Sequence, residues 1–345
     1  TGDHPLTAIE IARQLGIAGA ESSVSRRSDF QRQETLESVK ALTGAELENL
    51  SFDELKNVVE EVNVFARIAP EHKLKIVAAL QEKGHVVAMT GDSVKDAPAL
   101  RKADIGVAMG VSGADVSKEA SDLVLLDDNF AAIAASAREG RAIYDNLRKF
   151  TRFSAAGNIG KALAMLLAPF TGALPLPPLQ ALWLNLLTDG LLGLGMGAEN
   201  PEADMMKRKP FSPKEGVFSR GAGVQTIWVG AMIGALALGL GGWYFYQKRP
   251  EWQTMIFTSL AFMQVFQALA SRSSKASLFK LGALSNPLLA GMALLAAALQ
   301  MAVMYIPPLA AFLEVLPLNG CDLSIAAGAG AVVFAAMETA KRFRK

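Results

Sequence analysis

The stretch VVAMTGDSVKDAPALRKADIGVAMG (residues 86–110) decides the fold class of this chain. A short apolar run ends in Asp92, and a second aspartate, Asp96, follows one helical turn later. The segment then passes through a helical pattern into a second apolar run at 105–110. Strand, helix and strand in this order predict a parallel sheet, whose ligands bind at the carboxyl ends of its strands. Asp92 is expected at such an end.

The flanking residues continue this alternation. Strands are predicted at 64–68, 85–92, 105–110 and 123–126, and helices at 6–17, 51–62 and 70–84. Ser51 and Glu54 have the spacing of a capping box, and Pro70 suits the first position of a helix. The polar residues 26–38 are expected to form a loop. We therefore predict an α/β, Rossmann-like domain with a parallel sheet at 1–148.

The rest of the chain is apolar enough to cross a membrane. The 345 residues are 51% hydrophobic, and charged residues concentrate in the first 150. Beyond them, apolar runs of roughly 20 residues recur, which is the length that spans a bilayer. Six spans are predicted, at about 150–171, 178–198, 223–246, 253–271, 286–306 and 322–340. Residues 149–345 are expected to form an all-α six-helix transmembrane bundle, and a very apolar soluble bundle is the alternative.

Basic residues in the predicted loops set the orientation of these spans. The side expected to be cytosolic carries Lys207, Arg208, Lys209, Lys214, Arg220, Arg272, Lys275, Lys280, Lys341, Arg342, Arg344 and Lys345. The other side carries Lys248 and Arg249. Residues 1–148 and the C-terminus are therefore expected in the cytosol. The formal net charge of +1 gives no reason to expect a nucleic-acid partner.

Small residues recur four apart in the third predicted span. Gly230 with Gly234 and Ala231 with Ala235 have the spacing that lets helices approach closely in lipid. We expect a close helix crossing at this span.

The predicted domain contains the groups that phosphoryl transfer uses. Thr1 supplies a hydroxyl, Lys73 a cation, and Asp92 and Asp96 a carboxylate pair able to share Mg²⁺. Each has an ordinary alternative, since a lysine on an amphipathic helix usually faces solvent and Thr or Asp often caps a helix. The combination favours a phosphate site.

Polar side chains inside the predicted spans indicate a second site, because such groups are costly in lipid and usually functional. They are Asn158, Lys161, Asn185, Thr188, Asp189 and Gln264. The spacing i, i+3, i+4 puts Asn185, Thr188 and Asp189 on one helical face. Asn158 and Lys161, three apart, are expected to share a face as well.

Four segments resemble the back half of a P-type cation-transporting ATPase. They are TGDHPLTAIEIARQLGI, VFARIAPEHKLKIV, the opening stretch, and SDLVLLDDNFAAIAASAREGRAIYDNLRKF. ALWLNLLTDGLLGLGMG, followed by MKRKPFSPKEGVFS, is similar to the calcium-pump-like branch. The resemblance covers essentially the whole chain. It implies a haloacid-dehalogenase-type domain, ATP hydrolysis through an aspartyl-phosphate, and coupling of that phosphate to helices that carry the ion.

The resemblance also implies residue roles in the cytosolic domain. Thr1 matches the threonine that contacts the phosphoryl group, and Gly2 and Asp3 complete its loop. Lys73 matches the phosphate-binding lysine. Asp92 matches the Mg²⁺ ligand, and Asp96 matches its hydrogen-bonded partner.

The chain departs from the family pattern TGDGVNDAP at two positions. Ser93 replaces a glycine and is expected to strain the loop if that position needs positive φ. Lys95 replaces an asparagine with a side chain that only donates, so it either adds charge at the phosphate or competes with Mg²⁺. The sequence also lacks the DKTGT loop with its nucleophilic aspartate. We expect this chain to be the C-terminal part of a pump, inactive alone.

In the membrane, the resemblance implies that Asn158, Asn185, Thr188 and Asp189 give oxygen ligands to the transported ion. Lys161 is at a position where pumps with two ion sites have an acidic ligand. Gln264 is at a position that is acidic in some of these pumps. Lys161 is expected to act as a tethered counter-ion that leaves one ion site. A purely structural Lys161–Asp189 salt bridge is the alternative, and the two are compatible.

The expected function is therefore ATP-driven transport of a cation, with Ca²⁺ favoured and a monovalent cation or proton as alternatives. Mg²⁺ and ATP are the expected cofactors, with the nucleotide domain outside this chain. Expected partners are the cation, membrane lipid and the N-terminal part of the pump, in the plasma membrane of a prokaryote. A naturally truncated regulator or assembly partner is the alternative from another class. A membrane-tethered phosphatase lacks a nucleophilic aspartate in the right context.

Overall fold

The computed structural model describes residues 4–17, 40–202, 204–212, 215–273, 276–282 and 284–342. The chain divides into two compact units, 1–134 and 135–345, within helix α8 (Ala131–Ala164). The predicted boundary at 148–149 lies in the same helix. Because Thr1, Gly2, Asp3 and the whole of the predicted 26–38 loop lie outside the described residues, those predictions stay untested.

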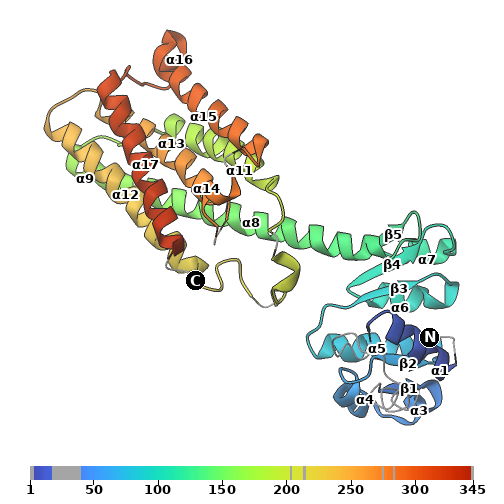
Figure 1. Ribbon diagram of the computed structural model, residues 1–345. Helices are drawn as coiled ribbons and strands as arrows, with labels where there is room; N and C mark the ends of the chain where they lie inside the picture. Colours follow the sequence, from blue (N-terminus) through green and yellow to red (C-terminus); the bar gives the residue numbers. More distant parts are fainter. Residues whose placement is uncertain are drawn as a thin grey trace. The chain divides into compact units, whose positions relative to one another are not determined.

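The first unit alternates short strands with helices (Figure 1). Its strands are β1 (Ala41–Thr43), β2 (Val64–Ala66), β3 (Ala88–Gly91), β4 (Ile105–Met109) and β5 (Leu123–Leu125). Its helices are α1 (Pro5–Gln14), α3 (Gly44–Asn49), α4 (Phe52–Val58), α5 (Pro70–Glu82), the 3₁₀ turn η1 (Val94–Asp96), α6 (Ala97–Lys102) and α7 (Asp115–Glu119). All three strand pairings, β1–β2, β3–β4 and β4–β5, are parallel, which confirms the predicted α/β class.

Local signals account for the starts of two of these helices. Ser51 and Glu54 form the predicted capping box at the start of α4, and Pro70 opens α5. Helix α4 ends at Val58, four residues before the predicted end at 62, and β1 has no counterpart among the predicted strands. Three residues give too short a pattern to separate a strand from a loop.

The sheet of the first unit is interrupted. Strands β1 and β2 form one sheet and β3, β4 and β5 another, in the order β3-β4-β5. A cavity of about 510 Å³ is lined by side chains of β2, β3, α1 and α5. Within the described residues, β2 and β3 therefore each keep one edge without a strand partner, and an open edge is a template for further pairing.

The second unit is helical throughout its described regular structure. Beyond α8 it contains η2 (Met165–Leu167), α9 (Ala168–Thr171), α10 (Pro178–Trp183), the π-helical turn η3 (Leu184–Thr188), α11 (Asp189–Gly197), η4 (Met205–Lys207), α12 (Ala222–Tyr246), α13 (Trp252–Ala270), α14 (Leu278–Leu281), α15 (Pro287–Tyr305), α16 (Pro307–Phe312) and α17 (Gly320–Arg342). Helix α13 packs against α12, α15 and α17.

Four helical stretches of the described chain are long and apolar enough to cross a membrane. They are Ala131–Thr171, Ala222–Tyr246, Pro287–Tyr305 and Gly320–Arg342. The other two predicted spans correspond to α10–η3–α11, which the π turn divides, and to α13. Of the 19 residues of α13, 15 are buried, so this helix faces protein and tolerates more polar side chains than a lipid-facing one. The helical region is consistent with the six-helix bundle.

The predicted close crossing occurs between α12 and α8. A Cβ added to Gly230 would lie 2.6 Å from the Cβ of Ile159, and one added to Gly234 would lie 2.5 Å from the Cβ of Leu163. Ala231 and Ala235, by contrast, are exposed. The glycine pair therefore makes the contact, and the alanine pair does not.

Gly230→Ala should destabilise the protein by about 1–3 kcal/mol, because the new methyl group overlaps the α8 backbone and Ile159. Gly239→Ala is the matched control, since no atom lies within 4 Å of its Cβ position. The control should be neutral or stabilising by about 0.5–1 kcal/mol, as for an exposed helical glycine. Thermal unfolding in detergent measures both, and equal effects would contradict the close crossing.

Candidate functional site

The first candidate site forms where β3 ends and α5 begins. Lys73 lies in the first turn of α5, and its Nζ is 2.5 Å from Oδ1 of Asp96. The other carboxylate oxygen of Asp96 accepts hydrogen bonds from the Ser93 hydroxyl at 2.8 Å and the Ser93 amide at 3.3 Å. Asp96 is buried, with 4% of its surface exposed. The structure therefore brings together the predicted lysine and one of the two predicted aspartates.

Ser93 does not strain this loop, because the position does not need the positive φ on which the expected strain depended. Its φ is −107° and its ψ is 156°, an extended conformation open to any residue. Its hydroxyl donates a hydrogen bond to the carboxylate of Asp96, so Ser93 supports the loop. The neighbouring Gly91 is the residue that needs to be small, because an added Cβ would lie 2.6 Å from the Cβ of Asp96.

Asp92 has a different environment from Asp96. It is exposed and directly follows β3, at the carboxyl end of a parallel strand as predicted. The described residues contain no group of three or more His, Cys, Asp or Glu side chains placed to hold a metal ion. Mg²⁺ commonly takes one or two protein carboxylates and completes its shell with waters and substrate phosphate. Asp92 suits that chemistry, whereas Asp96 already binds Lys73 and Ser93.

Lys95 is exposed on η1, and in the described part of the chain it forms no ion pair or hydrogen bond. Its ammonium is more than 4.0 Å from any described carboxylate. It therefore differs from Lys73, whose charge is already neutralised by Asp96.

The electrostatics of Asp96 follow from these contacts. Burial raises the pKa of its carboxyl, but the Lys73 ammonium and the Ser93 donors outweigh burial, so the pKa lies below its ordinary value of 3.8. A carboxyl with a lowered folded-state pKa contributes stability above its unfolded-state pKa. That contribution is lost as the pH falls through the folded-state pKa.

The second candidate site lies in the helical unit. Lys161 of α8 is buried, with 6% of its surface exposed, and its Nζ lies 2.8 Å from Oδ2 of Asp189. The same ammonium donates to Oδ1 of Asn185. Asp189 is buried at 5% exposure, and its Oδ1 has no hydrogen-bond partner among the described residues. The predicted Lys161–Asp189 pair is thus formed, and the Oδ1 atom of Asp189 stays without a described hydrogen-bond partner.

The π-helical turn η3 holds this cluster, and the sequence pattern did not predict it. It runs from Leu184 to Thr188, so it contains Asn185 and Thr188, and Asp189 directly follows it as the first residue of α11. A π turn widens the helix and occurs often at functional sites. Asn185 and Asp189 both accept hydrogen bonds from Lys161, whereas Thr188 is buried and has no hydrogen bond to it in the described chain. The only sequence signal was the run of polar residues in an apolar segment.

The remaining predicted residues lie apart from this ion pair. Asn158 is on the exposed side of α8, and no hydrogen bond joins it to Lys161 or Asp189 in the described chain. Gln264 of α13 is buried at 1% exposure, and both atoms of its amide lack a partner there. A Cβ on Gly157 would lie 2.8 Å from the Gln264 amide nitrogen, so Gly157 gives this side chain its space.

Two protein-family models match this chain, one in each of its two units. A model of haloacid dehalogenase-like hydrolases matches residues 1–104, and one of the C-terminus of cation-transporting ATPases matches 173–343. The chain belongs to the P-type cation-transporting ATPases. Membership in this membrane-pump family, together with the four apolar helices, makes it a multi-pass membrane protein.

Three relatives of this P-type ATPase chain illustrate the similarity. A calcium-transporting ATPase of Bacillus subtilis is 44% identical over 338 residues, which are 96% of this chain and 36% of the relative. Calcium-transporting ATPase 1 of Bacillus cereus is 40% identical over 329 residues, 90% of this chain and 35% of the relative. Calcium-transporting ATPase type 2C member 2 of Rattus norvegicus is 36% identical over 356 residues, all of this chain and 35% of the relative. The chain spans about a third of the length of these relatives.

Lys73→Met should remove the stabilisation that Asp96 gains from ionisation, because burial then acts on an unpaired carboxylate. Above pH 5, the variant should unfold about 1–3 kcal/mol more easily than the parent. Below the folded-state pKa of Asp96 the difference should shrink, since the carboxyl is protonated in both proteins.

Thermal unfolding as a function of pH measures this. Lys75→Met is the matched control, since Lys75 is exposed on the same helix and forms no described ion pair. A pH-independent difference between the Lys73 variant and the parent would show that the pair does not govern the pKa of Asp96.

Proposed function

We propose that this chain carries the ion-binding and phosphate-binding parts of an ATP-driven cation pump, with Ca²⁺ as the transported ion. The observation that carries this proposal is the buried Lys161–Asp189 pair, which keeps one carboxylate oxygen free inside an apolar helical unit. Three relatives matched over nearly the whole chain are named calcium-transporting ATPases, which favours Ca²⁺ over a monovalent cation or proton.

One ion site is the arrangement that these charges support. The free Oδ1 of Asp189 and the exposed Asn185 side chain offer hard oxygen ligands of the kind Ca²⁺ takes. Lys161 brings a fixed positive charge to the same oxygens, and it has no lone pair while it is protonated. It therefore neutralises Asp189 when the ion is absent and excludes a second cation. Asn158, Thr188 and Gln264 are weaker candidates, since none of them is hydrogen-bonded to the pair among the described residues.

In the first unit, we assign Asp92 as the Mg²⁺ ligand and Lys73 as the phosphate-binding cation, held in place by Asp96. Bound Mg²⁺ would neutralise charge on the phosphoryl group. Thr1, Gly2 and Asp3 complete this assignment by resemblance. The open edges of β2 and β3 suit further strands, and we propose that the nucleophilic aspartate enters the site on a strand added there.

The basic residues of the loops favour an orientation with residues 1–148 and the C-terminus in the cytosol. We propose the plasma membrane of a prokaryote as the location. A naturally truncated regulator is not favoured, because the matched relatives are themselves transporting ATPases. ATP and membrane lipid are accordingly the other partners.

Asp189→Asn should abolish most Ca²⁺-stimulated ATP hydrolysis by the full-length protein, because the ligand loses its charge. Asp204→Asn is the matched control, since Asp204 is a half-exposed carboxylate outside the pair. ATPase activity against free Ca²⁺ measures both. An unchanged Ca²⁺ dependence in Asp189→Asn would rule out this site.

Lys161→Gln separates a tethered counter-ion from a purely structural salt bridge. Removing one partner of a buried pair costs about 3–5 kcal/mol, so the variant should unfold more easily without Ca²⁺. If Lys161 occupies the ion's position, saturating Ca²⁺ should restore much of that loss. Thermal unfolding with and without Ca²⁺ measures this, with the exposed Lys207→Gln as control. An equal loss in both conditions would support the structural alternative.

A further inference from the structure

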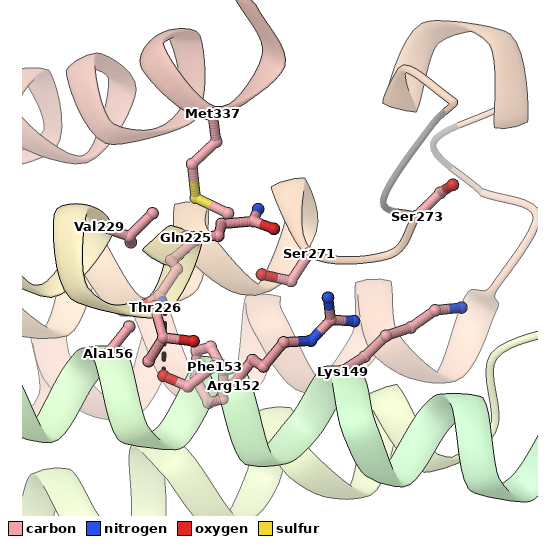
Figure 2. Close-up of a pocket in the computed structure, with 11 residues that line it drawn as sticks. Lys149, Arg152, Phe153, Ala156, Gln225, Thr226, Val229, Ser271, Ser273 and Met337 are labelled. Carbon is pink, nitrogen blue, oxygen red and sulfur yellow. Dashed lines mark hydrogen bonds between the residues drawn. The ribbon is translucent and has the colours of Figure 1, made fainter. Parts of the chain in front are cut away.

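A cationic pocket lies in the helical unit away from the Lys161–Asp189 pair. It is formed by α8, α12, α13, α17 and the residues that follow α13 (Figure 2). Its described lining residues include two cations, Lys149 and Arg152, and no carboxylate. Figure 2 shows these two side chains extending toward Ser273, while Met337 and Val229 lie at the other end. The pocket therefore has a charged end and an apolar end.

Lys149 is the unusual member of this pocket. Only 5% of its surface is exposed. Its nearest carboxylate oxygen, on Glu202, lies 3.7 Å away, beyond hydrogen-bonding distance. Glu199 and Asp145 also act on the ammonium electrostatically, but no described residue accepts a hydrogen bond from it. A buried ammonium without a hydrogen-bond acceptor is costly. An acceptor that entered the pocket would satisfy it.

The surrounding charge also favours an anion. A neighbouring cavity of about 140 Å³ shares Lys149 and Arg152 and adds three arginines and two carboxylates. Both carboxylates, Asp145 and Glu202, pair with Arg208, and Arg220 pairs with Glu215, so the lining itself keeps an excess of cations. Two of those arginines, Arg148 and Arg220, stack on the ring of Phe211 at 3.9 and 4.1 Å. This concentration of positive charge in a partly enclosed space raises the local concentration of anions.

One neutral donor, the Ser271 hydroxyl, completes the site, because the Gln267 amide is already engaged. Ser271 lines the pocket, and its hydroxyl makes no hydrogen bond within the described residues. The amide nitrogen of Gln267 donates to the Phe153 carbonyl at 3.2 Å. An ammonium, a guanidinium and a hydroxyl are the donor set that recognises phosphate oxygens.

We propose that this pocket binds a phosphate group between Lys149 and Arg152. Two sources share that chemistry, the headgroup of an anionic lipid and free inorganic phosphate. The apolar end, with Val229 and Met337, suits a headgroup whose chain continues along the bundle. Basic pockets between membrane helices on the cytosolic side recognise anionic headgroups in this way. The inference concerns a second ligand and does not depend on which cation is transported.

The test uses the full-length protein in detergent. Native mass spectrometry measures its affinity for phosphatidylglycerol and for phosphatidylcholine, and thermal unfolding measures stabilisation by inorganic phosphate. The double variant Lys149→Gln/Arg152→Gln removes both cations and should weaken the bound phosphate species roughly tenfold or more. The matched control Lys207→Gln/Lys280→Gln removes two exposed cations outside the pocket and should leave binding unchanged.

The outcomes distinguish the two sources. If the double variant loses only phosphatidylglycerol binding, the ligand is a lipid headgroup. If it loses only the stabilisation by inorganic phosphate, the ligand is free phosphate. Either result supports the site. If neither ligand distinguishes the double variant from the control, the proposal is wrong. The charge-preserving variant Lys149→Arg/Arg152→Lys should retain most of the binding, which guards against a simple folding defect.

Discussion

The buried ion pair between Lys161 and Asp189 is the interaction on which the helical unit depends. Both groups are more than nine-tenths buried, and charges taken out of water are tolerated only when they are paired. The pair ties α8 to the π turn η3, because Lys161 also binds Asn185. Any cation that coordinates Asp189 must compete with, or displace, an ammonium that the chain supplies itself. Because of this competition, the same carboxylate affects both the folding stability of the helical unit and its affinity for a cation.

Much of the fold could be predicted from residue patterns. The alternation around residues 86–110 predicted the parallel strands, and Ser51 with Glu54 predicted the cap of α4. The interruption between β2 and β3 could not be predicted, since strand patterns do not say which strands are neighbours. The environment of helix α13 could not be predicted either. Most of its polar side chains are buried inside the protein, and a hydropathy average cannot tell a polar residue that is buried from one that faces water.

The candidate sites were predictable as residue types but not as contacts. The spacing of Asp92 and Asp96 suggested one shared metal, whereas the structure ties Asp96 to Lys73, which lies 23 residues away, and leaves Asp92 exposed. Likewise, i, i+3, i+4 spacing placed Thr188 beside Asp189 on an α-helical face, but a π turn changes that geometry. Local spacing carries no information on which long-range partner satisfies a buried charge.

The number of Ca²⁺ ions that the full-length protein binds at equilibrium tests this account most directly. Lys161 provides one positive charge beside Asp189, which is the only acidic side chain paired with it among the described residues, so we expect one ion per polypeptide, measured by isotope binding. Two ions per polypeptide would contradict it, because a second cation would then share the site with Lys161.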